Sequence, residues 1–455
     1  MSFIPNTDAD RKRMLEAIGV AGVDELFADV PAESRYPRLD LPSPVSEMEA
    51  LGELEELARR DLDCTRAPCF LGAGAYRHFI PSVVDFVVSR SEFSTAYTPY
   101  QPEISQGILQ SIFEYQSLLC ELLGMEVANA SLYDWSSALG EAALLANRIN
   151  HRDTILVPYF ISPSRLAVLK TYIEPVGMKV EKLDYDKTTG QVEIEDLKEK
   201  VNDHTAAVYV ESPSYLGFVE ERVEAISEIA HGKDALFIAG VDPISLGILK
   251  APGDYGADLV IGEGQPLGNH MNYGGPLLGI FAAKHDNKVI RQMPGRIIGI
   301  TETLEGGRRA YVMTLQTREQ HIRREKATSN ICSNEALCSV ASAVYLSLLG
   351  PQGLRDLGEV VTSRAHYAMR RIGELPGVRA PMFNSYHFKE FAVGFKGKTA
   401  ETVNKALLSN RIQGGLPLAR SFPELGEAAL YCVTEMHTKK DIDALVSGLR
   451  EVLEV

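Results

Sequence analysis

The chain has 455 residues, of which 45% are hydrophobic and 24% are charged, a composition typical of an ordinary globular protein. Its length predicts two or three domains and is ample for a large buried core. There are 61 acidic and 46 basic side chains, which gives a formal net charge of −15. Such a surface repels phosphate backbones and anionic lipid, so we expect neither a nucleic-acid partner nor a membrane partner.

The cysteines and the first residues indicate the compartment. None of the six cysteines lies at C-x-x-C spacing from another, which predicts free thiols in a reducing compartment. The segment from Met1 to Arg13 has no apolar core and contains Asp8 and Asp10, unlike a secretory signal. No run of about 20 apolar residues occurs, so no membrane span is expected. We therefore expect a cytoplasmic protein.

Residues 1–60 are predicted to form a helical and extended arm. Thr7 and Asp10 have the spacing of a capping box ahead of the apolar-periodic stretch from Met14 to Val20. Four prolines then occur in residues 31–44 and favour an extended backbone. An arm of this kind either wraps a partner or serves as a surface linker, and the sequence leaves both possibilities open.

Residues 61–330 are predicted to form a large α/β domain. From about residue 130, apolar runs of strand length alternate with amphipathic helical stretches. This alternation predicts a mostly parallel sheet that is covered by helices on both faces and binds ligands at the carboxyl ends of its strands. The expected helices are 136–149, 162–173, 193–201 and 223–230, and the expected strands are 154–160, 179–183, 205–210, 235–241, 258–261 and 277–282.

Residues 331–455 are predicted to form a smaller C-terminal α+β domain. A long helix is expected over 334–348, with Ser333 placed to cap its start and Gly350-Pro351 to stop it. The remaining residues contain helical and strand patterns without the long βα alternation of the preceding domain.

Three stretches hold polar side chains that suit either chemistry or local structure. The first stretch is the proline-stiffened loop Tyr97-Thr-Pro-Tyr-Gln-Pro-Glu-Ile-Ser-Gln-Gly107. Two interpretations are open for it: its polar side chains point toward a ligand, or it is a structural turn. The hydroxyl residues of 134–140 begin a helix, where they bind a phosphate or act as caps. Asp242 ends an apolar strand, where its carboxylate pairs with a pyridinium nitrogen or caps the turn at Pro243.

Two further stretches follow. The loop from Gly262 to Pro276 holds five glycines in fifteen residues, which mark tight turns or close backbone approach, and it contains no lysine. The basic run from Gln320 to Asn334 includes Thr328-Ser329-Asn330. Two interpretations are open for these three residues: contact with a phosphate or a neighbouring subunit, or capping of a turn. The ten histidines show no metal-binding spacing, so no metal site is expected.

Together these stretches resemble the N-terminal half of the glycine cleavage system P-protein in its split form, over essentially the whole chain. The resemblance rests on Phe3-Ile-Pro-Asn-Thr7, Phe70-Leu-Gly-Ala-Gly74, Tyr97-Thr-Pro-Tyr-Gln101, Gly274-Gly-Pro276 and Lys326-Ala-Thr-Ser-Asn-Ile-Cys332. The tyrosine loop and the Lys326 string are specific to the family, whereas glycine pairs are common. The length and the N-terminal string resemble the alpha subunit. One departure is Ser214, where the family has asparagine.

The resemblance implies a fold-type-I pyridoxal-phosphate architecture and an enzyme that decarboxylates glycine and passes the aminomethyl group to the lipoyl group of the H-protein. It also implies an α₂β₂ assembly in which the beta subunit holds the pyridoxal phosphate covalently. A resting Schiff base needs a lysine amine, and no lysine lies between Lys250 and Lys284. We therefore assign no catalytic residue to this chain and interpret Asp242 and Ser136 as remnants of a cofactor site.

The resemblance also places two strings near the seam between subunits, where they are expected to contact the cofactor phosphate or the substrate held by beta. These residues are Tyr97, Thr98, Tyr100, Gln101, Thr328, Ser329 and Asn330. Two alternatives remain. The chain could be a stand-alone pyridoxal-phosphate decarboxylase or lyase with an unusually placed lysine, or it could be a catalytically inert scaffold subunit.

Overall fold

The structure is a computed structural model that describes residues 5–95, 98–314, 320–327, 329, 331 and 334–454, with the backbone alone at 320 and 321. Its contacts divide the chain into two compact units, residues 1–62 and 63–455. The predicted division of the second unit at residue 330 into a large and a small domain stays a prediction.

The first unit contains two α-helices, α1 (Asp8–Ile18) and α2 (Glu47–Arg60), and two short 3₁₀ helices, η1 (Val23–Phe27) and η2 (Ala32–Ser34). The predicted capping box at the start of α1 is confirmed. The Thr7 hydroxyl accepts from the Asp10 N–H at 3.2 Å, and the Asp10 carboxylate accepts from the Thr7 N–H at 3.0 Å. None of the described residues of this unit is buried.

The second unit is built on a seven-stranded sheet with the order β1-β7-β6-β5-β4-β2-β3. Neighbouring strands are parallel except at β7, which runs antiparallel to both β6 and β1. The predicted alternation of strands and helices is confirmed. The strand predicted over 154–160 is shorter and ends at Val157, because Pro158 has no N–H for a ladder hydrogen bond. The strands are β1 (Val127–Ala128), β2 (Thr154–Val157), β3 (Lys179–Lys182), β4 (Thr205–Glu211), β5 (Leu236–Val241), β6 (Leu259–Glu263) and β7 (Gly279–Ala283).

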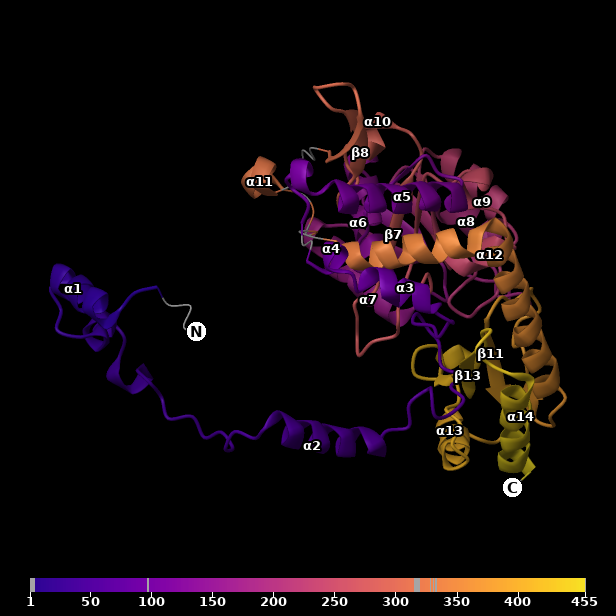
Figure 1. Ribbon diagram of the computed structural model, residues 1–455. Helices are drawn as coiled ribbons and strands as arrows, with labels where there is room; N and C mark the ends of the chain where they lie inside the picture. The colour runs from indigo at the N-terminus through magenta and orange to yellow at the C-terminus, as the bar shows by residue number, and fades with distance from the viewer. Residues whose placement is uncertain are drawn as a thin grey trace. The chain divides into compact units, whose positions relative to one another are not determined.

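Helices connect these strands and cover the sheet (Figure 1). The connecting helices are α6 (Trp135–Asn150), α7 (Pro163–Ile173), α8 (Ile194–Lys200) and α9 (Val223–His231), with short turns η4 (Glu174–Val176), η5 (Pro243–Gly247) and η6 (Pro252–Tyr255). Before the sheet come α3 (Ser82–Val88), α4 (Ser91–Ser94), η3 (Pro102–Ile104) and α5 (Gln106–Leu123). After it come α10 (Asn287–Ile290), the hairpin of β8 (Ile298–Glu302) and β9 (Arg309–Met313), α11 (Gln320–Arg323) and η7 (Arg324–Lys326).

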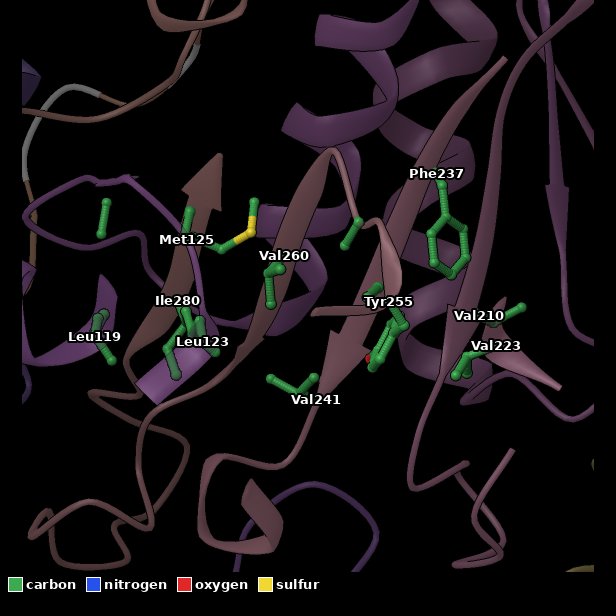
Figure 2. Close-up of a cluster of buried hydrophobic side chains, with 14 of the residues drawn as sticks. Leu119, Leu123, Met125, Val210, Val223, Phe237, Val241, Tyr255, Val260 and Ile280 are labelled. Atoms are coloured by element: carbon green, nitrogen blue, oxygen red, sulfur yellow. The ribbon is translucent and has the colours of Figure 1, made fainter. Parts of the chain in front are cut away.

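Both faces of the sheet are buried, so successive residues of one strand alternate between two hydrophobic cores. In β5, Phe237 and Val241 pack in the core that includes α5 and α9, whereas Ile238 packs in the core that includes α6 and α7. Figure 2 shows the first of these cores, where Val241, Val260 and Ile280 come from three neighbouring strands. The continuous apolar runs of the sequence are therefore strands covered on both sides.

The C-terminal part begins with α12 (Ala336–Gly373), which passes α5 and then, beyond a bend, α14 (Figure 1). Gly350 breaks its helical backbone with φ 60° and ψ −177°. The predicted stop at Gly350-Pro351 is thus a bend, because Pro351 begins a second helical stretch that the sequence analysis missed. The N-cap is Glu335, and Ser333, the predicted cap, lies outside the described residues.

A second, four-stranded sheet with the order β10-β11-β13-β12 completes this part. Among the described residues, α12 alone is long and apolar enough to cross a membrane by length and composition. Its buried residues belong to the cores of both sheets, so packing accounts for its apolar character. The remaining elements are β10 (Val378–Arg379), β11 (Glu390–Phe395), α13 (Ala400–Ser409), β12 (Leu416–Pro417), η8 (Pro423–Leu425), β13 (Ala428–Cys432) and α14 (Lys439–Glu454).

Candidate functional site

The carboxyl ends of β4 and β5, where this class of sheet binds ligands, surround a very small cavity. Its volume is about 10 Å³, which is room for about one water molecule. The side chains that close it come from the strand ends, from α6 and α7, and from residues 388–390. The lining residues are Tyr76, Trp135, Arg165, Pro213, Ser214, Tyr215, Gly217, Asp242, Phe388, Lys389 and Glu390.

Asp242 is buried at the end of β5, and both of its carboxylate oxygens are engaged. Oδ1 accepts from the Ile244 N–H at 3.0 Å, so the capping role that the sequence left open is present. Oδ2 forms an ion pair with the ammonium of Lys389, which is also buried. The carboxylate that could meet a pyridinium nitrogen therefore already has a cation from its own chain.

Two aromatic side chains, His78 and Tyr76, hold Lys389 in addition to Asp242. Its Nζ donates to His78 Nε2 at 3.2 Å and lies 3.4 Å from the centroid of the Tyr76 ring. Because Nε2 accepts this bond, the ring proton of His78 lies on Nδ1 and is donated to Glu435 at 2.8 Å. Burial alone would raise the pKa of Glu435, but the contact with His78 and the hydrogen bond from the Phe79 N–H together outweigh burial, and the pKa is lowered.

Sequence reasoning missed this network because its members are far apart in the chain. His78 and Lys389 are separated by 311 residues, and no local spacing connects them. The usable signal was the pair Lys389-Glu390 inside an otherwise apolar run, because charged residues in such a run are buried only when they are partnered.

Arg165 and Trp135 fill the space next to Asp242. The guanidinium of Arg165 makes two hydrogen bonds to Glu211, at 2.9 and 2.7 Å, and stacks 4.0 Å from the centroid of the Trp135 ring. Burial disfavours the charged form of Arg165, but the charge and hydrogen bonds of Glu211, together with the neighbouring Tyr209, outweigh burial and raise the pKa of Arg165. A planar cation over an indole is a stable arrangement that leaves no room between them for another ring.

The N-terminus of α6, where hydroxyl residues suggested either a phosphate site or a cap, is capped. The Asp134 carboxylate accepts from the Ser137 N–H at 2.8 Å. A second carboxylate, Glu263 at the end of β6, accepts from the Trp135 N–H at 3.2 Å. The position where a helix N-terminus would hold a phosphate is thus taken by carboxyl groups of the chain itself. Ser136 is buried beside them.

The loop from Gly262 to Pro276 has no amine to offer at this site. Its buried Gln265 accepts from the Tyr76 N–H at 2.9 Å and donates to the Tyr76 carbonyl at 3.1 Å. The two flanking lysines are engaged elsewhere, Lys250 with Glu224 at 3.0 Å and Lys284 with Asp258. These residues do not fit a pyridoxal-phosphate group. Carboxyl groups of the chain occupy the helix N-terminus that would bind the phosphate, Arg165 and Trp135 fill the space for the pyridine ring, and the loop contains no lysine.

The seven predicted seam residues are only partly described. Tyr97, Thr328 and Asn330 lie outside the described residues. Thr98, Tyr100 and Gln101 share one loop before η3, and the Tyr100 hydroxyl, on a side chain that is 57% exposed, accepts from Arg296 at 3.1 Å. The Ser329 hydroxyl donates to the buried Glu141 of α6 at 3.0 Å.

Ser214, the departure from the family pattern, lines the closed cavity. It is 9% exposed, and its hydroxyl has no protein partner. A single water in the cavity suits this hydroxyl, since a buried polar group without a partner is costly.

The strand order, the strand-end pocket and the C-terminal sheet define the fold of the pyridoxal-phosphate-dependent enzymes of fold type I. The sphingosine-1-phosphate lyase of Burkholderia pseudomallei K96243 shares it, with 15% identity, a TM-score of 0.67 and coverage of 93% of this chain and 94% of that chain. A NifS-like protein shares it with 14% identity, a TM-score of 0.63 and coverage of 85% and 99%. The predicted fold class is confirmed.

Closer relatives identify the family. The model of the glycine cleavage system P-protein matches residues 1–449. The probable glycine dehydrogenase (decarboxylating) subunit 1 of Staphylothermus marinus is 50% identical, and that of Pyrococcus abyssi is 51% identical, each over 99% of this chain and at least 98% of the relative. The inhibitor-bound crystal structure of a glycine decarboxylase (P-protein) is 42% identical with a TM-score of 0.90 over 100% of both chains. The chain belongs to the glycine cleavage system P-protein family, as its motifs indicated.

Removal of the Lys389 ammonium tests whether it compensates the buried charge of Asp242. We expect Lys389→Met to lower the free energy of unfolding by about 3–5 kcal/mol, because it leaves a buried carboxylate without a cation. The double variant Lys389→Met/Asp242→Asn should recover part of this loss, since it removes the unpaired charge. Urea unfolding followed by circular dichroism measures both, and a double variant as unstable as the sum of the two single variants would contradict the pairing.

Glu390 makes the stability of the chain depend on pH. It accepts from the Ala73 N–H at 2.6 Å and from the Tyr76 hydroxyl at 2.7 Å, and burial raises its pKa from 4.5 to about 7. A carboxyl with a raised pKa holds its proton more tightly in the folded state. Its contribution to stability is therefore complete below pH 4.5 and is lost as the pH rises through about 7.

We therefore expect the free energy of unfolding to fall between pH 5 and pH 8, and Glu390→Gln to reduce this fall by about 1–3 kcal/mol. Urea titrations at the two pH values measure the difference. The matched control is Glu401→Gln, at an exposed position in α13. An equal effect of the two substitutions would refute the assignment to Glu390.

Proposed function

We propose that this chain is the subunit of a decarboxylating glycine dehydrogenase that binds no coenzyme itself and completes the active site of a second subunit. Together the two subunits would remove the carboxyl group of glycine as carbon dioxide and transfer the aminomethyl group to the lipoyl group of H-protein. The second subunit, corresponding to beta in an α₂β₂ assembly, would hold pyridoxal phosphate through a lysine of its own. The full-length similarity to proteins named subunit 1 supports a partner subunit.

The observation that carries this proposal is that the coenzyme region of the fold is closed by the chain's own side chains. Asp242 is paired with Lys389, Trp135 is stacked on Arg165, and Glu263 is bonded at the start of α6. Each contact satisfies a group that a coenzyme would otherwise satisfy. The pocket is therefore stable without a ligand, and catalysis requires a site on another chain.

A stand-alone enzyme would need an amine in this pocket, and Lys389 is the lysine that lines it. Its ammonium is held by Asp242 and His78, and the cavity beside it has room for about one water molecule. A Schiff base requires a free amine with space for the aldehyde. The geometry therefore favours a subunit that depends on its partner.

The loop that contains Thr98, Tyr100 and Gln101 supports the proposal that this chain contributes side chains to the active site of the second subunit. Arg296 orients Tyr100 through a hydrogen bond and lies 5.0 Å from the centroid of its ring, while the tyrosine itself stays exposed. An exposed aromatic side chain held in one direction is suited to contact a neighbouring subunit. We extend this role to Tyr97, Thr98, Gln101, Thr328, Ser329 and Asn330, with Ser329 acting through its contact to Glu141.

The free cysteines support a reducing, cytoplasmic compartment. Cys64, Cys69, Cys120, Cys338 and Cys432, the cysteines of the described residues, are all unpaired. Proteins of oxidising compartments usually link such thiols, so we place this subunit in the cytoplasm.

Coenzyme capture tests the proposal directly. We expect the isolated chain, incubated with pyridoxal phosphate and reduced with borohydride, to show no specific modified lysine by mass spectrometry. The exposed Lys233 serves as the measure of nonspecific labelling. The same treatment should modify one lysine of the second subunit. Stoichiometric labelling of Lys389, or glycine decarboxylation by the isolated chain, would overturn the proposal.

Substitutions at Tyr97 and Asn330, in the two stretches predicted to lie between the subunits, distinguish a chain that shares in catalysis from one that is only a scaffold. We expect Tyr97→Phe and Asn330→Ala to lower turnover of the assembled enzyme by at least ~10-fold while the complex stays intact, because each removes a polar group to which the proposal gives a contact with the cofactor or the substrate. Tyr386→Phe, in the C-terminal part, is the control. Full turnover by all three variants would show that the chain is only a scaffold.

A further inference from the structure

The first unit of the chain exposes far more apolar surface than its size predicts. Thirteen of the 30 large hydrophobic side chains that are exposed in the described residues lie in this unit, which is 62 of 455 residues. None of its described residues is buried. Apolar surface of this extent marks an interaction site. The thirteen residues are Met14, Ile18, Val23, Leu26, Phe27, Tyr36, Leu39, Leu41, Val45, Met48, Leu51, Leu54 and Leu57.

The unit is nevertheless built as defined structure. Both helices begin with a complete capping box, and α1 ends at Gly19 in the left-handed conformation, with φ 86°. Two ion pairs, Arg59 with Glu55 and Arg60 with Glu56, follow one side of α2. Helices of 11 and 14 residues are marginal in water even with such caps, so most of their stability must come from packing against another surface.

The apolar residues of α2 form a stripe along one side of the helix. Met48, Leu51 and Leu54 follow at intervals of three, and they are 80%, 57% and 63% exposed. Residues at this spacing lie on one face of a helix. The opposite face is polar and includes Glu53 and Glu56. An arrangement of this kind is suited to lie in an apolar groove.

A second anchor lies in the turn between α1 and α2. The rings of Phe27 and Tyr36 meet edge to face with centroids 6.3 Å apart, and the Tyr36 hydroxyl donates to Asp24 at 3.0 Å. Arg35 ties the turn together by donating to the carbonyls of Ala28 and Val30. The two rings are thus presented together, joined to α2 by the proline-containing segment 37–46.

We propose that the first unit is a clasp that binds the second subunit of the enzyme, with the α2 stripe and the Phe27–Tyr36 pair as its two anchors. This inference rests on the proposed function for the existence of that subunit. Thirteen large apolar side chains, each about half exposed or more, can supply roughly the ~800 Å² that one partner contributes to a standard interface.

Charge favours a different subunit over a second copy of this chain. Residues 1–62 carry fourteen acidic and seven basic side chains, and the rest of the chain is also acidic in balance. A second copy would bring like charges together, which lowers both the rate and the affinity of association. The occupant we commit to is therefore a second subunit with an apolar groove bordered by basic side chains.

The test measures association of the full-length chain with the separately purified, coenzyme-loaded second subunit, by calorimetry and sedimentation velocity. We expect Leu51→Ser/Leu54→Ser, and independently Phe27→Ser/Tyr36→Ser, to weaken binding by at least ~10-fold, because each removes two large apolar anchors. The matched control is Glu53→Ser/Glu56→Ser on the opposite face of α2, which should change the affinity by less than about 2-fold.

Thermal unfolding of each isolated variant should match the wild type, since none of the substituted side chains is buried. Wild-type affinity in both apolar variants would refute the clasp. A homodimer of the isolated chain that the apolar variants dissociate would make a second copy the occupant and would also refute it. If the wild-type subunits bind each other but do not decarboxylate glycine, the proposed function fails while the clasp stands.

Discussion

A buried carboxylate needs a compensating cation, and in this chain Asp242 finds that cation in Lys389. The pair joins the end of β5 to the strand that begins with Glu390, and through His78 it extends to Glu435. Gly217 lets the loop after β4 approach that strand closely, because any Cβ at this position would lie 1.8 Å from the Glu390 carbonyl oxygen. The carboxyl edge of the sheet is thus held closed by contacts within the chain.

The same principle accounts for the other contacts at this edge. A helix N-terminus leaves N–H donors without partners, and the carboxyl group of Glu263 accepts from one of them. A buried guanidinium needs an anion and a flat apolar neighbour, and Glu211 and Trp135 supply these. The fold of a coenzyme-binding family is retained, while the groups that a coenzyme would contact are satisfied from within. These contacts within the chain hold the carboxyl edge of the sheet together.

Much of the fold could be predicted from the sequence, because apolar periodicity and turn residues are local. The strands and α-helices from 154 to 283 were predicted to within three residues at their ends. The lack of lysine in the loop from Gly262 to Pro276 is visible without a structure. The bend at Gly350 was predicted as the end of the helix, since a local pattern does not show that a second helical stretch follows directly. The Asp242–Lys389 pair could not be predicted, because it depends on how distant segments pack. The sequence left two roles open for Asp242, capping a turn or pairing with a pyridinium nitrogen. In the structure Asp242 caps the turn, and its charge partner is Lys389.

The closed pocket also determines what it would take to introduce a coenzyme site into this chain. Gln265 holds the backbone of Tyr76, whose ring covers Lys389, which in turn neutralises Asp242. A lysine in place of Gln265 would lose the first contact, while Arg165 and Trp135 would still fill the ring space and Lys389 would still hold Asp242. Each single step toward a working coenzyme site would cost stability before it restored any chemistry. A coenzyme site could therefore be built into this pocket only by changing Gln265, Tyr76 and Lys389 together.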